Sequence, residues 1–386
     1  MTVLPKGAKS GLMAVFDALG SPHMDRHLAR RDRLRRAVKR TGADALLVTN
    51  FINVTYLTGF TGEDSYLLVR PDGDLMLSDY RFITQLEEEC PGLDVHIRRH
   101  SVTMVKTVAK IVRSAKIANL GIEAGSMTVA LRDEIAKQLP KLQIQPTTEL
   151  VETQRAIKDK GEITQLRQSI RFAQKAFGVL RATLRPEKTE KELAIELEHQ
   201  IRLFGAKVRG FQSIIGVGPR AALPHAVPSE RRVADSDFVL VDWGANGGLY
   251  ISDLTRVLVT GRISSKFERI YRVVLEAQTR AIAKIGPGVA AKEVDQVARG
   301  IIADAGFGRR FGHGLGHGLG LEVHEAPRLA ANSQDVLRPG MVVTVEPGIY
   351  IPGWGGVRLE DDVLVTRTGH EVLTSVPKRL EEVIVG

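Results

Sequence analysis

The chain has 386 residues, more than the ~100–200 of an ordinary domain, so two domains are expected. A hydrophobic content of 43% and a charged content of 26% are typical of folded globular proteins and exclude disordered, collagen-like and coiled-coil classes. The single cysteine, Cys90, cannot form an internal disulfide, which favours a reducing compartment and excludes a thiolate zinc cluster.

The first twenty residues do not resemble a signal peptide. Lys6, Lys9 and Asp17 interrupt their apolar stretches, and no apolar run in the chain approaches the ~18 residues of a membrane span. We therefore expect a cytoplasmic protein with no membrane partner.

The net charge of +9 raises the hypothesis of nucleic-acid binding, but most of it lies in one segment. Residues 26–40, RHLARRDRLRRAVKR, hold eight Lys or Arg and one Asp. Leu28, Leu34, Ala37 and Val38 recur there at helical spacing, which predicts an amphipathic helix with a basic outer face. A solvated face is favoured over nucleic-acid binding, because no aromatic stacking platform or zinc-finger spacing accompanies the charge.

The first 150 residues alternate short β-rich runs with helical patterns, which predicts an α/β domain. We expect strands at 45–49, 65–69 and 75–78. The turn residues at 71–74 suit a hairpin between the last two strands. Helices are expected at 80–89, 103–114 and 127–139, with Ser126 as the N-cap of the last.

We place the domain boundary at about residue 155, which gives domains 1–155 and 156–386. A long helical pattern runs from there to about Leu184. Thr189 and Glu192 form a capping box before the next helix, which ends at Gly205. Further helices are expected near 265–284 and 291–305, between glycine-rich, strand-like segments. The second domain is therefore predicted to be α+β.

Residues 238–259, FVLVDWGANGGLYISDLTRVLV, predict two strands joined by a tight turn at Gly247-Gly248. If these glycines are the turn centre, paired positions sum to 495, so Asp242 lies directly opposite Asp253. Opposed side chains have Cβ atoms roughly 4.5–5.5 Å apart, where two carboxylates repel each other unless a cation lies between them. The alternative is that each Asp has its own arginine or backbone partner.

A second hairpin is expected at 342–365, VVTVEPGIYIPGWGGVRLEDDVLV. Glu346 and Glu360 are equidistant from Gly353 in its loop, although a longer loop fixes the register less well. Arg358 shares a strand face with Glu360, where its charge would neutralise a carboxylate or hold an anionic substrate group. A plain structural salt bridge remains the alternative.

Three histidines, His313, His317 and His324, lie in the glycine-rich segment FGHGLGHGLGLEVHE at 311–325. The glycines around His317 permit close backbone approach but disfavour a regular helix, so this is not an HExxH-type pair of ligands. Dinucleotide binding is disfavoured, because the GxGxxG-like text has no strand-then-helix context with a downstream acid. A glycine-rich connector with incidental histidines remains the alternative.

Taken together, these segments supply four carboxylates and one imidazole: Asp242, Asp253, Glu346, Glu360 and His317. This set of ligands suits two ions of Mn²⁺, Co²⁺ or Zn²⁺ better than Cu⁺ or an iron–sulfur cluster. Two such ions about 3.5–4 Å apart can share a hydroxide and polarise a carbonyl, which is the chemistry of amide hydrolysis.

At these residues the second half of the chain resembles the pita-bread metallopeptidases, in particular the aminopeptidase P and prolidase branch that cleaves the bond before proline. The resemblance rests on DWGANGGLYISDLTR, HGLGHGLGLEVHE, VEPGIY and RLEDD. It implies that Asp242 chelates one metal, that His317 and Glu346 bind the other, and that Asp253 and Glu360 bridge the pair. It further implies that Glu346 is the proton shuttle.

The resemblance also implies residues outside the metal ligands. His225 in LPHAVPS and His324 would contact the substrate and stabilise the tetrahedral intermediate. His313 and Arg358 fall on family motif positions, His313 as a substrate-binding residue and Arg358 as part of the catalytic site. Arg328 and Arg358 are the candidates for the substrate carboxylate.

The resemblance extends to the first half through TNFINVTYLTGF at 49–60. The fold that it implies is an α/β N-terminal creatinase-like domain followed by an α+β pita-bread catalytic domain. One departure is Arg220 in GPRAALPH, where the family more commonly has a small or amide residue. This departure concerns the detail of substrate contacts near that loop and not the metal site.

The implied activity is that of an Xaa-Pro aminopeptidase, with an Xaa-Pro dipeptidase (prolidase) as the alternative. Its implied cofactors are two divalent metal ions, Mn²⁺ first and Co²⁺ or Zn²⁺ otherwise, and its partners are proline-containing peptides and a second copy of the chain. A creatinase-type amidinohydrolase is disfavoured, because all five ligand positions are intact. A non-catalytic protein that binds an acidic partner through residues 26–40 would have no reason to keep them.

Overall fold

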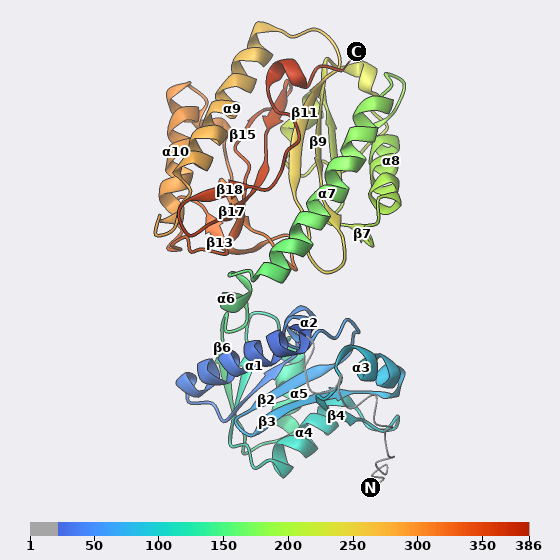
Figure 1. Ribbon diagram of the computed structural model, residues 1–386, viewed down its shortest axis with the longest axis vertical. Helices are drawn as coiled ribbons and strands as arrows, with labels where there is room; N and C mark the ends of the chain where they lie inside the picture. The colour runs from blue at the N-terminus through green and yellow to red at the C-terminus, as the bar shows by residue number, and fades with distance from the viewer. Residues whose placement is uncertain (1–21, 386) are drawn as a thin grey trace. The chain divides into compact units, whose positions relative to one another are not determined.

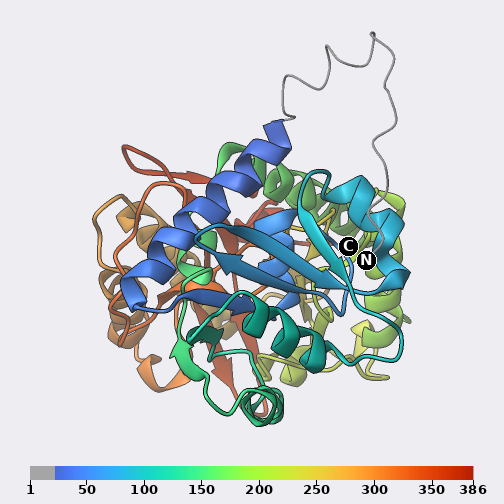
Figure 2. The ribbon, with the colours of Figure 1, turned by 90° about the horizontal axis from the view of Figure 1, so that it is seen from below.

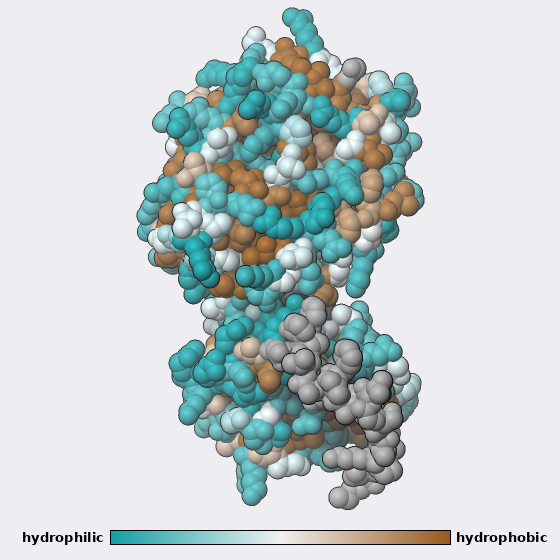
Figure 3. Space-filling model, in the orientation of Figure 1, coloured by the Kyte–Doolittle hydropathy of each residue, from teal (hydrophilic) through white to brown (hydrophobic). Residues whose placement is uncertain are grey.

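The computed structural model describes residues 22–385 and divides them into two compact units. The first unit ends at Gln154 and the second begins at Arg155 (Figure 1). No helix within the described range is long and apolar enough to cross a membrane. The face of the second unit in Figure 3 is a mosaic of hydrophilic and hydrophobic residues.

The first unit is built on one mixed sheet with strand order β4-β3-β2-β1-β5-β6. Its strands are β1 (Ala45–Val48), β2 (Tyr66–Arg70), β3 (Gly73–Ser78), β4 (Asp94–Ile97), β5 (Asn119–Glu123) and β6 (Gln143–Thr147). Its helices are α1 (Pro22–Thr41), α2 (Phe51–Thr58), α3 (Ile83–Glu89), α4 (Met104–Ser114) and α5 (Val129–Gln138). Figure 2 shows α1 and the α4–α5 pair on opposite sides of this sheet. The predicted α/β class is confirmed.

Local turn chemistry explains most of the element boundaries in this unit. Arg70 pairs with Gly73, so β2 and β3 form the predicted hairpin. The predicted cap of α5 is wrong: Thr128, and not Ser126, accepts the backbone N–H of Leu131. Both residues are good N-caps, and the later one is used because the helix begins at Val129.

The basic segment 26–40 lies on α1, but its predicted apolar and basic faces are only partly right. Leu28, expected on the buried face, is 47% exposed, whereas the guanidinium of Arg30 is buried and donates to the Tyr56 carbonyl at 3.0 Å. The guanidiniums of Arg31 and Arg35 donate to the buried Asp74 carboxylate at 2.7 and 2.8 Å. Three of the arginines therefore fasten the helix to its own unit, because a buried carboxylate and backbone carbonyl need donors.

The second unit has a three-stranded sheet, β11-β9-β8, a five-stranded sheet, β13-β12-β14-β17-β18, and the two-stranded pairs β15-β16 and β10-β7. The strands are β7 (Val208–Arg209), β8 (Ile214–Val217), β9 (Phe238–Trp243), β10 (Ala245–Asn246), β11 (Leu254–Val259), β12 (Gly316–Gly318), β13 (Glu325–Leu329), β14 (Val342–Val345), β15 (Gly348–Ile351), β16 (Gly355–Arg358), β17 (Asp361–Val365) and β18 (His370–Val372). The helices are α7 (Lys160–Thr183), α8 (Glu190–Leu203), α9 (Ser265–Lys284) and α10 (Ala291–Asp304). The short helix α6 (Glu152–Arg155) contains the point at which the first unit ends and the second begins. Figure 1 shows α7 and α8 on one side of the strands and α9 and α10 on the other.

The long helices of this unit begin where their side chains satisfy the first backbone N–H groups. Asp159 caps α7 and forms a capping box with Glu162. Thr189 and Glu192 form the predicted capping box of α8. Gly205, two residues past the end of α8, has a φ of +108°, which a residue with a side chain rarely adopts.

Trp243 connects the central strand of the smaller sheet to helix α7. Its indole stacks on Phe177 with ring centroids 4.2 Å apart, and its Nε1–H donates to the Ala173 carbonyl at 2.9 Å. Because Trp243 follows Asp242 directly, this contact also fixes the backbone from which the Asp242 carboxylate projects.

We expect Asp74→Ala to destabilise the first unit by about 1–3 kcal/mol, because two arginines of α1 lose a buried acceptor. Denaturation followed by hydrogen exchange of peptides from α1 measures this change. Asp133→Ala removes an exposed partner of Arg132 and should change stability by less than about 0.5 kcal/mol. Equal effects of the two substitutions would contradict the anchoring role of Asp74.

Candidate metal centre

The first carboxylate pair lies on neighbouring strands, but not in the predicted register. Asp242 on β9 pairs with Thr255 on β11, and not with Asp253. The centre of the turn lies one residue further along the chain than predicted, because Asn246 forms a bridge with Ile251. Side chains alternate with a period of two, so this two-residue shift leaves Asp253 on the same face as Asp242. The two carboxylates are diagonal neighbours.

The second carboxylate pair has the predicted register. Thr344 pairs with Asp362, and Gly348 pairs with Arg358, and each pair is equidistant from Gly353. Glu346 directly follows β14 and Glu360 directly precedes β17. The two residues therefore lie opposite each other, between the β14–β17 pairs and the β15–β16 pairs.

Thr255 joins the two hairpins. Its carbonyl accepts the Glu360 N–H at 3.2 Å, and its hydroxyl donates to Glu360 Oε2 at 2.6 Å. Sequence reasoning missed this residue, although its position two residues after Asp253 places it on the carboxylate face.

The strand β12 places His317 at the same point. The His317 N–H donates to Thr344 Oγ1 at 3.1 Å. A Cβ atom on the neighbouring Gly316 would lie only 2.1 Å from the Thr344 carbonyl oxygen, so only glycine allows β12 to approach β14 this closely. The glycine-rich text therefore has a packing function here.

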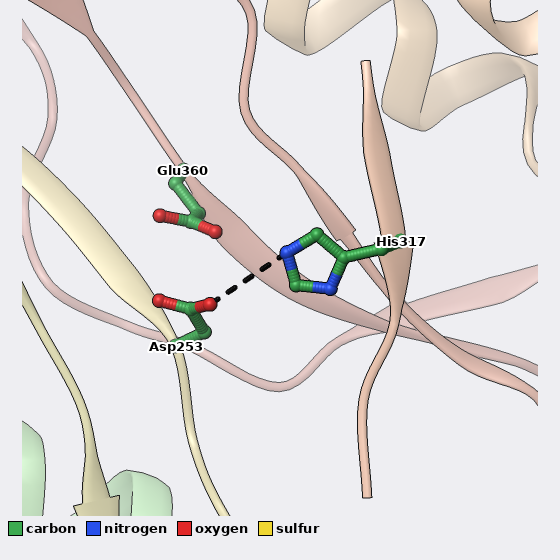
Figure 4. Close-up of side chains that lie close together, drawn as sticks. All are labelled: Asp253, His317 and Glu360. Atoms are coloured by element: carbon green, nitrogen blue, oxygen red, sulfur yellow. Dashed lines mark ion pairs between the residues drawn. The ribbon is translucent and has the colours of Figure 1, made fainter. Parts of the chain in front are cut away.

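These contacts bring together Asp253, His317 and Glu360, whose side-chain ligand atoms all lie within 4.8 Å of one another (Figure 4). His317 Nε2 lies 3.8 Å from Asp253 Oδ2 and 3.3 Å from Glu346 Oε1. These oxygen and nitrogen atoms converge on one point, which is the arrangement that a divalent cation requires of its ligands.

The hydrogen bond of His317 determines which ring nitrogen faces the carboxylates as a ligand. Nδ1 lies 3.0 Å from the Gly318 carbonyl, which can only accept, so Nδ1 carries the proton of the neutral imidazole. In this neutral form the lone pair of Nε2 points at Asp253 and Glu346. A metal ion between Nε2 and the carboxylates would then satisfy all of these acceptor atoms.

Electrostatics also favours bound cations. Burial, and then the charge of Glu360, raises the pKa of Asp253 well above its ordinary value. Burial, and then the charge of Glu346, raises the pKa of Glu360 well above its ordinary value. Burial also raises the pKa of Asp242, although the ion pair with Arg358 lowers it. Burial also opposes ionisation of Glu346, but in the metal-free protein a protonated His317 outweighs this and lowers the pKa of Glu346. Glu346 in turn raises the pKa of His317 against the effect of burial, so a cation bound at Nε2 would take the place of this proton. Among the residues that the structure describes, Asp242 Oδ1 is buried without a hydrogen-bond partner, as expected of a metal-binding oxygen.

Arg358 is bound to this carboxylate group and has little capacity for an anionic ligand. Its guanidinium is buried, forms an ion pair with Asp242, and donates to Thr255 Oγ1 at 3.0 Å and to Tyr350 Oη at 2.9 Å. Of the two roles predicted for Arg358, the contacts support neutralisation of a carboxylate.

Tyr350, which sequence reasoning did not single out, links Arg358 to His313. Because Tyr350 Oη accepts from Arg358, its own proton points to His313 Nε2 at 3.0 Å. His313 Nδ1 then donates to the Gly314 carbonyl at 2.7 Å. Both ring nitrogens of His313 are engaged inside the protein, so the structure gives this histidine a supporting position.

The remaining candidates lie at the exposed side of the centre. The ring of His324 lies 4.3 Å from that of His317, centroid to centroid, and its side chain is exposed. His225 is also exposed and close enough to Asp242 and His324 to affect the pKa of each. Arg328 on β13 pairs with His317 on β12, so both side chains project from the same face of the sheet.

The backbone after His324 is held by Glu325. Its carboxylate accepts from Arg155 Nη2 at 2.6 Å and from Lys158 Nζ at 3.1 Å, and both cations are buried. It also accepts the N–H of Leu321 at 2.9 Å. The hydrogen bond between Leu321 and Glu325 therefore joins the two ends of the segment 321–325, and the imidazole of His324 is exposed within it.

Two family models match this chain. Residues 164–367 match metallopeptidase family M24, and residues 30–157 match the creatinase/prolidase N-terminal domain. The uncharacterized peptidase YqhT of Bacillus subtilis is 39% identical over 90% of this chain and 98% of its own. The Xaa-Pro dipeptidase structure from Bacillus anthracis is 39% identical, with a TM-score of 0.88 over 93% of this chain and 99% of its own. The X-Pro aminopeptidase structure from Thermotoga maritima is 34% identical, with a TM-score of 0.81 over 89% and 99%.

We expect Asp253→Ala and Glu360→Ala each to abolish stoichiometric binding of divalent metal, because each removes an oxygen from the group of ligand atoms. Elemental analysis of protein dialysed against Mn²⁺ measures the bound metal. Glu230→Ala, which removes an exposed carboxylate paired with Lys191, should leave metal content unchanged. Full metal content in either of the first two variants would exclude that residue as a ligand.

The raised pKa values of Asp242, Asp253 and Glu360 predict how pH affects the metal-free protein. A carboxyl whose pKa is higher in the folded state stabilises the fold below its unfolded pKa of about 4, and this contribution is lost as pH rises. Thermal unfolding of metal-free protein should therefore show falling stability as pH rises above about 4. Added metal should reverse the loss, since binding to the folded state stabilises it. A metal-free protein whose stability is independent of pH would contradict this electrostatic description.

Proposed function

The chain belongs to metallopeptidase family M24 and is a peptidase, and we propose that it hydrolyses the peptide bond that precedes proline. The observation that carries the proposal is the convergence of Asp253, Glu346 and Glu360 on Nε2 of His317. The similar structures from Bacillus anthracis and Thermotoga maritima are named for action on Xaa-Pro substrates.

Asp242, Asp253, His317, Glu346 and Glu360 would hold two divalent cations, for which we propose Mn²⁺. When bound, such ions polarise a carbonyl and lower the pKa of water, which is the chemistry that amide hydrolysis needs. The carboxylates contribute hard oxygen donors and His317 a nitrogen, a mixture that Mn²⁺, Co²⁺ and Zn²⁺ accept.

Glu346 is the residue best placed to move a proton. Its Oε1 lies 3.3 Å from His317 Nε2 and 3.4 Å from the hydroxyl of Thr344, which hold the carboxylate at the edge of the ligand group. In this proposal Glu346 accepts a proton from the attacking water and delivers it to the departing proline nitrogen.

His225 and His324 would donate hydrogen bonds to the oxygen of the scissile carbonyl as negative charge develops on it. Both imidazoles are exposed beside the buried carboxylates, so a substrate reaches them without rearrangement of the core. Arg358 and Tyr350 would act behind the ligands, where Arg358 balances the charge of Asp242 and Tyr350 orients His313.

Arg328 is the arginine that we assign to the substrate carboxylate. It is exposed on the His317 face, and within residues 22–385 its guanidinium has no hydrogen-bonded or ionic partner. In an Xaa-Pro dipeptide the free carboxylate is carried by the residue that follows the scissile bond, so a cation on the strand next to His317 favours dipeptides over longer peptides. We therefore propose dipeptidase activity, with aminopeptidase activity on longer peptides as the alternative.

Two further parts of the proposal concern the setting of the enzyme. The single cysteine favours the reducing cytoplasm, and the family resemblance implies a homodimer. Light scattering of the purified protein gives the mass of the assembly, and a monomer would remove the dimer from the proposal.

The first test is hydrolysis of Ala-Pro and Ala-Pro-Ala by metal-stripped protein with and without added Mn²⁺, Co²⁺ or Zn²⁺. We expect cleavage only with metal, and faster cleavage of Ala-Pro. Arg328→Met should raise KM for Ala-Pro about ten- to a hundredfold, the equivalent of a lost charged hydrogen bond, with little effect on Ala-Pro-Ala. Arg338→Met, at another exposed arginine, is the matched control.

Metal-bound protein that cleaves neither peptide would contradict the proposed function. Equal losses on both peptides in Arg328→Met would contradict the carboxylate assignment and leave the function standing.

A further inference from the structure

Glu190, the first residue of α8, is a fully buried carboxylate outside the metal centre. Its Oε1 accepts the N–H of Val217 at 2.8 Å. Its Oε2 accepts Arg220 Nε at 2.8 Å, and the N–H and hydroxyl of Ser229 at 2.8 and 2.7 Å. One side chain therefore receives four hydrogen bonds from residues 217–229.

The donors lie at both ends of the segment that carries His225. Val217 and Arg220 precede His225, and Ser229 follows it. Both ends of the segment therefore bind the Glu190 carboxylate, and His225 lies between them. Arg220 closes this loop a second time, because its Nη2 donates to the Val227 carbonyl at 2.5 Å. The loop 217–229 is thus held by one buried anion and one arginine.

The tip of the loop has few packing contacts of its own. Leu223, His225 and Val227 are exposed, and among the residues from 223 to 227 only Ala226 is buried. On the side of the metal centre, the Pro224 carbonyl accepts from Arg358 Nη2 at 3.3 Å. Ala221 and Ala226 pack into the core of the unit, but His225 and its neighbours Leu223 and Val227 do not, so the hydrogen bonds to Glu190 and Arg358 add to a small packing contact at the tip.

Charge makes Arg220 the critical member of this arrangement. A fully buried carboxylate is costly without a cation, and the ion pair of Glu190 is with Arg220. The Arg220 side chain is 28% exposed and lies between solvent and Glu190. Its guanidinium donates both to the Glu190 carboxylate and to the Val227 carbonyl. Replacing it leaves the Glu190 anion with neutral donors only, which the loop can relieve by opening to water.

We propose that Arg220 is a positioning residue, which holds the loop 217–229 on Glu190 and thereby fixes the imidazole of His225 beside the metal centre. The structural part of this inference stands on the contacts of Glu190. Its consequence for turnover rests on the proposed function, in which His225 stabilises the developing oxyanion.

Hydrogen–deuterium exchange of the metal-loaded protein tests the structural part. In Arg220→Met, peptides covering 217–229 should exchange at least tenfold faster than in the unmodified protein, while peptides covering β12 and β14 should not change. Lys191→Met is the matched control, since Lys191 follows Glu190 directly but pairs with the exposed Glu230. Unchanged exchange of 217–229 in Arg220→Met would overturn the proposal, whatever the activity.

A double-substitution cycle with His225→Ala tests the consequence for turnover. With metal content unchanged, Arg220→Met should lower kcat for Ala-Pro about ten- to a hundredfold, the range typical of residues that orient a catalytic group. Arg220→Lys keeps the charge beside Glu190 and should recover part of this loss. In the His225→Ala background Arg220→Met should cause little further loss, because the residue through which it acts is gone.

Losses that multiply in the double variant would show that Arg220 does not act through His225, and would overturn the positioning role while the proposed function stands. An unmodified protein that cleaves no Xaa-Pro peptide would instead remove the proposed function, and exchange of the loop 217–229 would then decide the structural part alone.

Discussion

The mutual repulsion of buried carboxylates is the constraint on which the second unit depends. Asp242, Asp253, Glu346 and Glu360 converge, with Arg358 as the cation bonded to one of them. With all four ionised, they carry more negative charge than Arg358 balances, and burial raises the cost of every charge that is not compensated. This is why the pKa values of Asp242, Asp253 and Glu360 are raised. Two divalent cations would supply the missing positive charge.

The neighbouring polar residues hold this charged group in place. Thr255 binds the carboxylate and the backbone of Glu360, and Thr344 accepts the backbone N–H of His317. Gly316 allows the strands β12 and β14 to lie close together. Arg358 neutralises Asp242 and fixes the hydroxyl of Tyr350. Positioning by such neighbours would let ligands from separate hairpins bind one cation with their side chains already oriented.

The two hairpins show how far register can be predicted from sequence. The longer loop around Gly353 gave the correct register, whereas the shorter turn at Gly247-Gly248 was displaced by the bridge between Asn246 and Ile251. The error did not affect the chemistry, because a shift of two residues keeps side chains on the same face of a strand. The basic helix was less predictable, since the burial of Arg30 depends on the Tyr56 carbonyl, a contact from outside the helix.

The sequence by itself determined the two-domain organisation that we proposed, the helix caps at Thr189 and Glu192, and the residue types able to bind metal, because these depend on local spacing and side-chain chemistry. Only the tertiary structure decided which residues share the space around His317. It turned Arg358 toward Asp242, placed Tyr350 between Arg358 and His313, and joined Glu190 to both ends of the His225 loop. These contacts join segments far apart in the chain, and no local pattern records which donors a buried carboxylate will meet once the strands are packed.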